Sequence, residues 1–432
     1  MKFYSTNKKS PLADLKEAVM GGLAPDGGLY MPAEIPKLPP DFFKRAPSLP
    51  FDELAFEVSQ KFFTPDVPLP ELRTMTAEAF NFAVPLVEID KDLWVLELFH
   101  GPTAAFKDFA ARFMARLFGY FAQHSPQEVT ILVATSGDTG SAVAAGFLGV
   151  KGVKVVILYP SGKVSGLQEK QLTTMGGNIT ALEVNGTFDD CQDLVKQAML
   201  DKQIQKRQAL ASANSINIAR LLPQSFYYFY LAGQLQNSNK PLVVSVPCGN
   251  FGNLTAGLIA RRMGAPIDKF VAATNSNDSL PRYLKTGKFV AKPSVATISN
   301  AMDVGNPSNF ARMLDLYKND IGKMRRDIEG TSFSDTKTRR AITKVFNDYG
   351  YTMDPHGAVA YLGLQEFQKK SPGSTGVFVE TASPAKFAGV VEAAIGQPVP
   401  LPPKFKRLAK RQKQSILINN DFAQLKDFLL NQ

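Results

Sequence analysis

The sequence predicts an α/β fold built on parallel sheet, and two observations support this prediction. First, short continuous apolar segments alternate along the chain with segments of helical periodicity. Continuous rather than alternating apolar strands are typical of parallel sheets that are covered on both faces. Second, 432 residues exceed what a single hydrophobic core usually serves, so we expect two or three domains. The expected strands are residues 93–98, 129–134, 153–159, 178–184, 242–246, 270–274 and 376–380.

Helical segments lie between these strands. They are expected at residues 106–121, 141–147, 166–175, 189–210, 216–235, 254–263 and 384–395. The segment 291–373 looks mostly helical and polar, and its sequence indicates no role. The first ninety or so residues form a separate unit, with helices at 15–23 and 52–62 around turn-rich stretches. We therefore expect an N-terminal extension domain at 1–92, a smaller α/β domain at 93–235 and a larger α/β domain at 236–432.

Composition places the chain among ordinary globular proteins, with 44% hydrophobic and 20% charged residues. No apolar run reaches the roughly 18 residues expected of a membrane span, so no membrane partner is expected. The first residues lack the apolar core of a secretory signal. Cys191 and Cys248 are the only cysteines, which excludes a disulfide framework. These features favour a reducing, cytoplasmic location.

The net charge of +10 raises the possibility of an anionic partner. Much of the excess is local, because six lysines and arginines crowd residues 404–413. Such a run is usually a solvated surface, and no nucleic-acid motif accompanies it, so we expect no nucleic-acid partner. His100, His124 and His356 are scattered among different segments and show no ligand spacing. We therefore expect no metal site.

One lysine lies in an unusual setting. Lys107 follows a stretch of small residues and stands near the start of a predicted helix with a buried face. That face is formed by Phe106, Phe109, Phe113, Leu117 and Phe121. Burial would lower the pKa of the Lys107 amine, and a neutral amine is what attack on an aldehyde requires. Lys107 is thus a candidate Schiff-base lysine, although a lysine with its head in water explains the pattern as well.

Two loops between a strand and a helix suit anions, because ligands bind at the carboxyl ends of parallel strands. The loop at 134–141 offers Ser136, Thr139 and the N–H groups of a helix start, which suit a carboxylate or phosphate. An ordinary helix cap is the alternative. The loop at 247–253 contains glycines and asparagines that let backbone N–H groups converge on a phosphate. Its candidate residues are Gly249, Asn250, Phe251, Gly252 and Asn253.

The 247–253 loop is neither a Walker loop nor a dinucleotide fingerprint, so a phosphate without a nucleotide fits better. A tight strand–helix turn remains the alternative. In the segment at 214–220, Asn214, Ser215 and Arg220 are candidates for a second anion site, and helix capping is an equally simple account. Thr381 follows a strand, where its hydroxyl suits a ring nitrogen or, alternatively, caps a helix. Together these groups match the needs of pyridoxal phosphate and a charged amino-acid substrate.

With these residues, the chain resembles the threonine synthase family, whose members are pyridoxal-phosphate enzymes of fold type II. The matching blocks lie at Gly22–Tyr30, the Lys107 stretch, Ser136–Gly140, Asn185–Cys191, Asn214–Arg220, Gly249–Asn253, Asn306–Phe310 and Pro384–Phe387. They span nearly the whole chain, and their length and N-terminal block resemble the longer bacterial and fungal branch. The resemblance implies two open, twisted, mostly parallel sheets flanked by helices, plus an N-terminal extension domain.

The resemblance also implies roles for the candidate residues. Lys107 would form the Schiff base with pyridoxal 5'-phosphate and move protons, the 249–253 loop would hold the cofactor phosphate, and Thr381 would contact the pyridine nitrogen. Asn214, Ser215 and Arg220 would hold the substrate phosphate, and Ser136 and Thr139 would face the substrate. Many enzymes of this fold have asparagine at the position of Asp138. Because a carboxylate there would repel the cofactor's phenolic oxygen, the role of Asp138 stays open.

The implied reaction converts O-phospho-L-homoserine and water into L-threonine and phosphate. Two alternatives remain from the sequence: a related lyase that performs elimination or replacement on phosphohomoserine or phosphoserine, and a non-catalytic paralogue that binds an anionic partner. The oligomeric state is expected to be a monomer or a homodimer.

Overall fold

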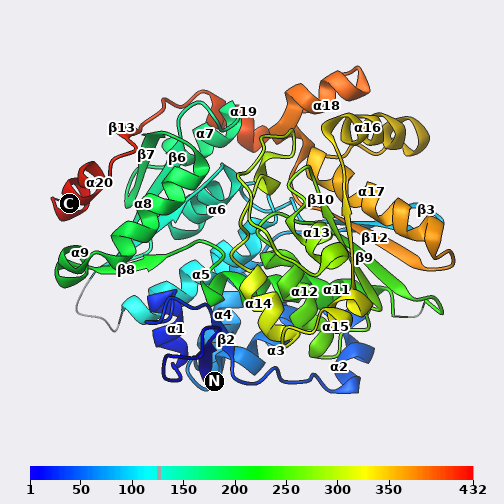
Figure 1. Cartoon of the computed structure of the whole chain (residues 1–432), viewed down its shortest axis with the longest axis horizontal. Coiled ribbons are helices and arrows are strands. Elements are labelled where there is room, and N and C mark those ends of the chain that lie inside the picture. Colours follow the sequence, from blue (N-terminus) through cyan, green and yellow to red (C-terminus); the bar gives the residue numbers. More distant parts are fainter. Residues whose placement is uncertain (124–127, 237, 432) are drawn as a thin grey trace.

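A computed structural model describes residues 1–123, 128–236 and 238–431. Within these residues two open sheets lie side by side with helices around them, and the N-terminal residues form a third unit next to both (Figure 1). The smaller sheet has the strand order β13-β7-β6-β5-β8, and all its pairs are parallel. Its strands are β5 (Val129–Ala134), β6 (Val153–Pro160), β7 (Ile179–Asn185), β8 (Ala209–Ser212) and β13 (Ile416–Asn419).

The larger sheet has the order β11-β10-β9-β12-β4-β3 and is parallel except for its last pair, β3 with β4. Its strands are β3 (Leu86–Asp90), β4 (Leu93–Glu97), β9 (Leu242–Pro247), β10 (Lys269–Thr274), β11 (Ile328–Ser332) and β12 (Thr375–Glu380). The α/β class and the strands expected from the sequence are confirmed.

Helices cover the faces of both sheets. Around the smaller sheet lie α5 (Lys107–Ala122), α6 (Asp138–Phe147), α7 (Gly166–Thr173), α8 (Phe188–Leu200), α9 (Lys202–Arg207), α19 (Pro403–Ala409) and α20 (Phe422–Leu430). The helices between residues 218 and 395 are α10 (Ile218–Leu221), α11 (Phe226–Gln234), α12 (Gly252–Arg262), α13 (Ser279–Thr286), α14 (Phe310–Leu316), α15 (Ile321–Asp327), α16 (Asp335–Tyr349), α17 (Pro355–Lys370) and α18 (Ala388–Ile395). Short 3₁₀ turns are η2 (Leu222–Ser225), η3 (Asn300–Met302) and η4 (Pro384–Phe387).

The N-terminal unit combines a small antiparallel strand pair with helices. Its elements are β1 (Phe3–Ser5), α1 (Leu15–Gly21), β2 (Tyr30–Pro32), α2 (Pro40–Arg45), η1 (Ala46–Ser48), α3 (Phe51–Phe63) and α4 (Leu69–Ala79). Helix α3 packs against α11, and α4 packs against α5, so this unit covers the helices between the two sheets. None of the helices in the described residues is both long and apolar enough to cross a bilayer.

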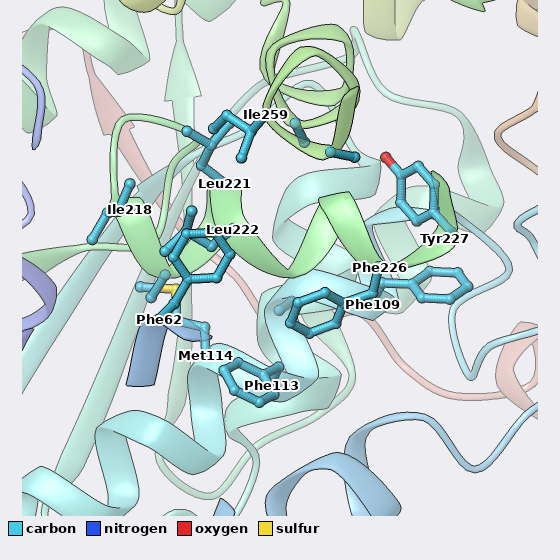
Figure 2. Packing of buried hydrophobic residues seen from close by; sticks show 14 of the residues in the cluster. Phe62, Phe109, Phe113, Met114, Ile218, Leu221, Leu222, Phe226, Tyr227 and Ile259 are labelled. Carbon is cyan, nitrogen blue, oxygen red and sulfur yellow. The ribbon is translucent and has the colours of Figure 1, made fainter. Parts of the chain in front are cut away.

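The apolar face expected on α5 is buried in an aromatic core. Phe109 and Phe113 have no exposed surface, and they lie beside Leu222 and Phe226 of the chain that follows α10 (Figure 2). The ring centroid of Phe109 is 5.5 Å from that of Tyr227. This core fixes the orientation of α5, whose first residue is Lys107.

Two expected helices are interrupted. Asp201 separates α8 from α9, because its carboxylate accepts the N–H groups of Gln203 and Ile204 and starts a new helix. The chain after α9 then forms β8 rather than helix. The predicted helix at 216–235 divides into α10, η2 and α11, since Pro223 has no N–H for the helical ladder. The 291–373 segment is mostly helical as expected, but it also supplies β11.

Sheet membership differs from the expected grouping at two places. Strand β4 lies within the predicted smaller domain, residues 93–235, but pairs with β12 in the larger sheet. Strand β13 lies within the predicted larger domain, residues 236–432, but pairs with β7 in the smaller sheet. Strand partners depend on long-range packing, which a local apolar pattern does not encode. The domain boundaries at residues 92 and 235 stay predictions.

Candidate active site

One cavity between the two sheets collects all the candidate residues. It lies where the loops after β5, β8, β9 and β12 meet the start of α5, as expected for the carboxyl ends of parallel strands. The predicted residues that line it are Lys107, Ser136, Thr139, Asn214, Ser215, Arg220, Gly249, Asn250, Phe251, Gly252, Asn253 and Thr381. The structure thus brings them together, while the role of each stays a prediction.

Lys107 lies in the wall of this cavity. It keeps some accessible surface because it lines the cavity, but protein atoms otherwise enclose it. Burial lowers the pKa of its amine from 10.5 to about 8; the Asp138 carboxylate acts against this, whereas the Arg220 cation acts with it. A substantial share of the Lys107 amine is therefore neutral near pH 8 and available as a nucleophile.

Asp138, whose role the sequence left open, pairs with a second buried lysine. Its carboxylate oxygen lies 2.5 Å from Nζ of Lys386 and accepts a hydrogen bond of 2.9 Å from Nε2 of Gln168. Burial alone would raise the pKa of Asp138, but the charges and hydrogen bonds of these neighbours outweigh it and hold the pKa below its usual range. The negative charge on Asp138 is thus balanced by Lys386, which also donates to the carbonyl of Thr103.

The 249–253 loop places a helix start at the cavity. Phe251 has φ +59°, in the left-handed region, and α12 begins at the next residue. The N–H groups of Gly252 and Asn253 have no acceptor among the described residues. Free N–H groups at a helix start bind phosphate well. Gly249 allows a close approach of the chain, since a Cβ there would lie 2.8 Å from Cα of Met302.

Ser215 lies at the junction between this loop and the second candidate anion site. Its Oγ accepts hydrogen bonds from Asn250 Nδ2 at 2.7 Å and Asn309 Nδ2 at 3.2 Å. Since both contacts use the oxygen as acceptor, the hydroxyl proton of Ser215 remains to donate to a ligand. Asn214 is different, because its side chain bonds both the N–H and the carbonyl of Ala134 at the end of β5. Its amide therefore joins β8 to β5.

Arg220 is a buried cation with an unused donor. One Nη donates to the carbonyl of Ala213 at 2.5 Å, but Nε is buried without a hydrogen-bond partner among the described residues. Burial lowers the pKa of Arg220 to about 10, which leaves it charged at neutral pH. A buried charge with an unpaired N–H calls for an anion. An anionic group in the cavity would supply the missing acceptor.

Thr381 stands directly beside the start of the Lys107 segment. Its carbonyl accepts the N–H of Phe106 at 2.8 Å, and its side chain lines the cavity. A hydroxyl in this position suits a pyridine nitrogen. The donors present therefore fit pyridoxal phosphate: an amine of lowered pKa, free N–H groups for a phosphate, and a hydroxyl for the ring.

Several lining residues were not expected from the sequence. His356 is the clearest, with Nδ1 2.8 Å from a carboxylate oxygen of Asp354 and Nε2 accepting the N–H of Ala301 at 3.2 Å. It supports the 301–304 segment that forms one wall. The sequence feature that could have revealed His356 is the helix cap Asp-Pro-His-Gly at the start of the buried helix α17. It lies within the segment 291–373, to which the sequence assigned no role. Asp303, Gln192 and Phe188 also line the cavity. His124 lies outside the described residues.

The fold and this site define a class of protein. The family model for pyridoxal-phosphate dependent enzymes matches residues 71–391, and the chain is an enzyme of this class. Maize serine racemase shares the fold at 17% identity, with a TM-score of 0.55 over 72% of this chain. The expected type II fold of pyridoxal-phosphate enzymes is confirmed.

Two more family models match the ends of the chain: threonine synthase N terminus at residues 2–80 and threonine synthase, C-terminal, at residues 357–429. The threonine synthase of Haemophilus influenzae is 44% identical over 431 residues, and that of Escherichia coli is 43% identical over 435 residues. Both alignments cover 100% of this chain and of the relative. The chain belongs to the threonine synthase family.

Solved structures agree with this membership. The crystal structure of threonine synthase from Escherichia coli has a TM-score of 0.94 at 42% identity and covers 100% of both chains. A pyridoxal-phosphate-bound threonine synthase from Brucella melitensis has a TM-score of 0.93 at 34% identity, covering 100% of this chain and 99% of that one.

Proposed function

We propose that this chain is a threonine synthase that converts O-phospho-L-homoserine and water into L-threonine and phosphate. One observation carries the proposal: a single cavity joins the Lys107 amine to two separate anion sites. The first is the start of α12 at Gly252, and the second is formed by Ser215 and Arg220. Two sites are needed because cofactor and substrate each carry a phosphate. The full-length similarity to threonine synthases supports the same substrate.

The cofactor is pyridoxal phosphate, and the residues that would hold it come from three loops. Lys107 would bind its aldehyde carbon through Nζ, the N–H groups of Gly252 and Asn253 its phosphate, and the hydroxyl of Thr381 its ring nitrogen. When bound, this cofactor supplies an electron sink for negative charge that develops on a substrate carbon. The remaining chemistry is placement and proton transfer by the chain's own side chains.

Lys107 is the proton carrier in this proposal. Once the substrate's own amino group has taken the place of Lys107, the free Nζ would take the proton from Cα and then help to remove one from Cβ as phosphate leaves from Cγ. The two protons would return to Cγ, which becomes a methyl group, and to Cα, while water would supply the Cβ hydroxyl and the proton that the released phosphate carries. A pKa of about 8 suits this work, because a general base is most effective when its pKa lies near the working pH. The Asp138–Lys386 pair stays close by and keeps the local charge balanced.

Substrate recognition divides between two loops. The hydroxyls of Ser136 and Thr139, with the N–H groups at the start of α6, bind the substrate carboxylate. Ser215 Oγ and the Arg220 guanidinium bind the substrate phosphate. Asn214 was also predicted to contact this phosphate; since its amide already bonds Ala134, we propose that it acts by holding the Ser215 turn in place.

We further propose that the enzyme works in the cytoplasm as a monomer or homodimer, without a nucleic-acid or membrane partner. The basic run near the C-terminus supports the absence of nucleic acid, since part of it is used within the chain. Lys413 lies 2.7 Å from a carboxylate oxygen of Glu169 and 2.6 Å from one of Glu183, and Lys404 donates to the carbonyl of Gly101. Light scattering after gel filtration would measure the oligomeric state.

The test is identification of the product. The holoenzyme is incubated with O-phospho-L-homoserine, and amino acids and free phosphate are quantified. Threonine and phosphate in equal amounts are expected. 2-Oxobutyrate would indicate an elimination enzyme, and a sulfur amino acid formed from phosphoserine and a thiol would indicate a replacement enzyme. No turnover and no near-visible cofactor absorbance would indicate a non-catalytic paralogue.

A further inference from the structure

Arg312 on α14 is completely buried, yet it does not line the cavity. Its guanidinium donates to the carbonyls of Ser215 at 2.9 Å, Ile216 at 2.6 Å and Tyr30 at 3.1 Å, and to Oδ1 of Asn309 at 2.7 Å. No carboxylate in the described part of the chain pairs with it. The guanidinium therefore bonds three backbone carbonyls and one side-chain amide instead of a carboxylate, which is unusual for a buried cation.

These bonds fix the turn that carries the second anion site. Ser215 and Ile216 precede α10, whose residue Arg220 lines the cavity and has a buried Nε–H without an acceptor among the described residues. Asn309 links Arg312 to the hydroxyl of the same turn: its Oδ1 accepts a hydrogen bond from Arg312, and its Nδ2 donates one to Ser215 Oγ at 3.2 Å. Arg312 therefore holds the carbonyl side of the turn directly and its hydroxyl side through Asn309.

The same helix is tied to the N-terminal unit. Besides the bond from Arg312 to the carbonyl of Tyr30, Asp315 accepts a hydrogen bond from the Tyr4 hydroxyl and lies 3.2 Å from Nζ of Lys8. Among the described residues, none from the N-terminal unit lines the cavity. Helix α14 is thus one connection between that unit and the anion site, and the bond from Asn217 Nδ2 to the carbonyl of Val19 at 2.8 Å is another.

Arg312 is also a buried charge without an ionic partner among the described residues. Burial lowers the pKa of Arg312 to about 9, so it remains a cation at neutral pH without a counter-ion. An unpaired buried cation is costly, and an anion bound on the other side of the Ser215 turn reduces that cost. An ammonium cannot replace the guanidinium fully, because its three N–H donors share one nitrogen, whereas the four acceptors lie around the three separate nitrogens of Arg312.

We propose that Arg312 is a positioning residue for the reaction: it holds the Ser215–Ile216 carbonyls against the N-terminal unit, so that Ser215 and Arg220 are placed to bind the substrate phosphate. The identity of that ligand rests on the proposed function. The inference about the turn does not, because inorganic phosphate can probe the same site.

The test compares Arg312→Met and Arg312→Lys with the wild-type holoenzyme. Arg112→Met is the matched control, because Arg112 also donates to two carbonyls, those of Glu78 and Ala79, and to an asparagine, Asn81. Arg112 lies on α5, outside the residues that line the cavity. Each protein is measured for cofactor absorbance, KM and kcat with O-phospho-L-homoserine, and the rise in melting temperature caused by inorganic phosphate.

For Arg312→Met we expect normal cofactor absorbance, a KM raised by roughly tenfold or more, a smaller change in kcat, and loss of the phosphate-induced rise in melting temperature. Arg312→Lys should fall between this variant and wild type. Arg112→Met should lose stability but keep both KM and the response to phosphate.

A folded Arg312→Met holoenzyme with wild-type KM and wild-type phosphate response would overturn the proposal. If that variant does not fold, Arg312→Lys decides, and an unchanged KM and phosphate response in it would equally overturn the proposal. Failure of the wild type to form threonine would refute the proposed function instead, and the phosphate response would still test Arg312.

Discussion

Replacing Lys107 by Met should stabilise the protein in its cofactor-free form. Burial lowers the pKa of Lys107 from 10.5 to about 8, which means that the folded state disfavours the charged amine. A difference of this size corresponds to about 3 kcal/mol, and we expect about 1–3 kcal/mol because Lys107 keeps some accessible surface at the cavity. Methionine fills a similar volume and carries no charge.

The sign and pH window follow from linkage. Below about pH 8 the amine is protonated in both the folded and unfolded states, so the full cost of burying the charge is present. Between about pH 8 and 10.5 the folded protein gives up the proton while the unfolded chain still holds it, and the cost disappears. The advantage of Lys107→Met should therefore be largest at pH 7 and fade as the pH rises toward 10.5.

Urea unfolding of the two apoproteins at pH 7 and pH 9.5 measures this difference. Lys151→Met, at an exposed turn, serves as the control and should change little at either pH. After reconstitution, Lys107→Met should also lack the near-visible absorbance of the lysine-bound cofactor. If the variant is no more stable than wild type at pH 7, or if its gain is the same at both pH values, the argument from burial is wrong.

Three further substitutions test the other parts of the site. Lys386→Met should cost about 3–5 kcal/mol in urea unfolding because it strands the buried Asp138 carboxylate, and adding Asp138→Asn should recover part of the loss; no recovery would contradict the pairing. Arg220→Ala should raise KM for O-phospho-L-homoserine by roughly tenfold to a hundredfold, since a charge-assisted hydrogen bond is lost, while cofactor absorbance stays nearly normal; equal loss of cofactor would show a structural role. Gly249→Ala should weaken cofactor binding in a pyridoxal-phosphate titration, because its Cβ would lie 2.8 Å from Met302 Cα; unchanged affinity would mean that the loop adapts.

Gly389→Ala is a suitable comparison for the glycine substitution. A Cβ at Gly389 meets no atom within 4 Å, and its backbone is helical. It should leave cofactor affinity unchanged, so a loss seen for both glycines would point to a general effect on folding.

The local pattern of apolar residues predicts much of the fold. The apolar strand segments and the buried face of α5 depend on residues that are neighbours in sequence, and the structure confirms them. The candidate site was accessible for a related reason. Loops that follow parallel strands lie at the same edge of a sheet, so the sequence predicts that Ser136, Gly249 and Thr381 meet, and all three line the cavity.

The residues that the sequence did not reveal act through partners far along the chain. Lys386 reaches Asp138 across 248 positions, and Arg312 reaches Ser215 across 97. No spacing rule connects such pairs, because their contacts exist only after the two sheets pack together. The same holds for β4 and β13, whose local sequences predict or permit a strand but not the sheet it joins.

The sequence alone therefore determined seven strands of the two sheets, the lysine and the loops that line the cavity, and the resemblance that led to the family. It did not reveal the strands β3, β8, β11 and β13. Only the tertiary structure decided which charges balance one another: Asp138 with Lys386, while Arg220 and Arg312 remain without a carboxylate partner among the described residues. The physical reason is that apolar periodicity records which face is buried, whereas the partner of a buried charge is set by distances between segments that are remote in sequence.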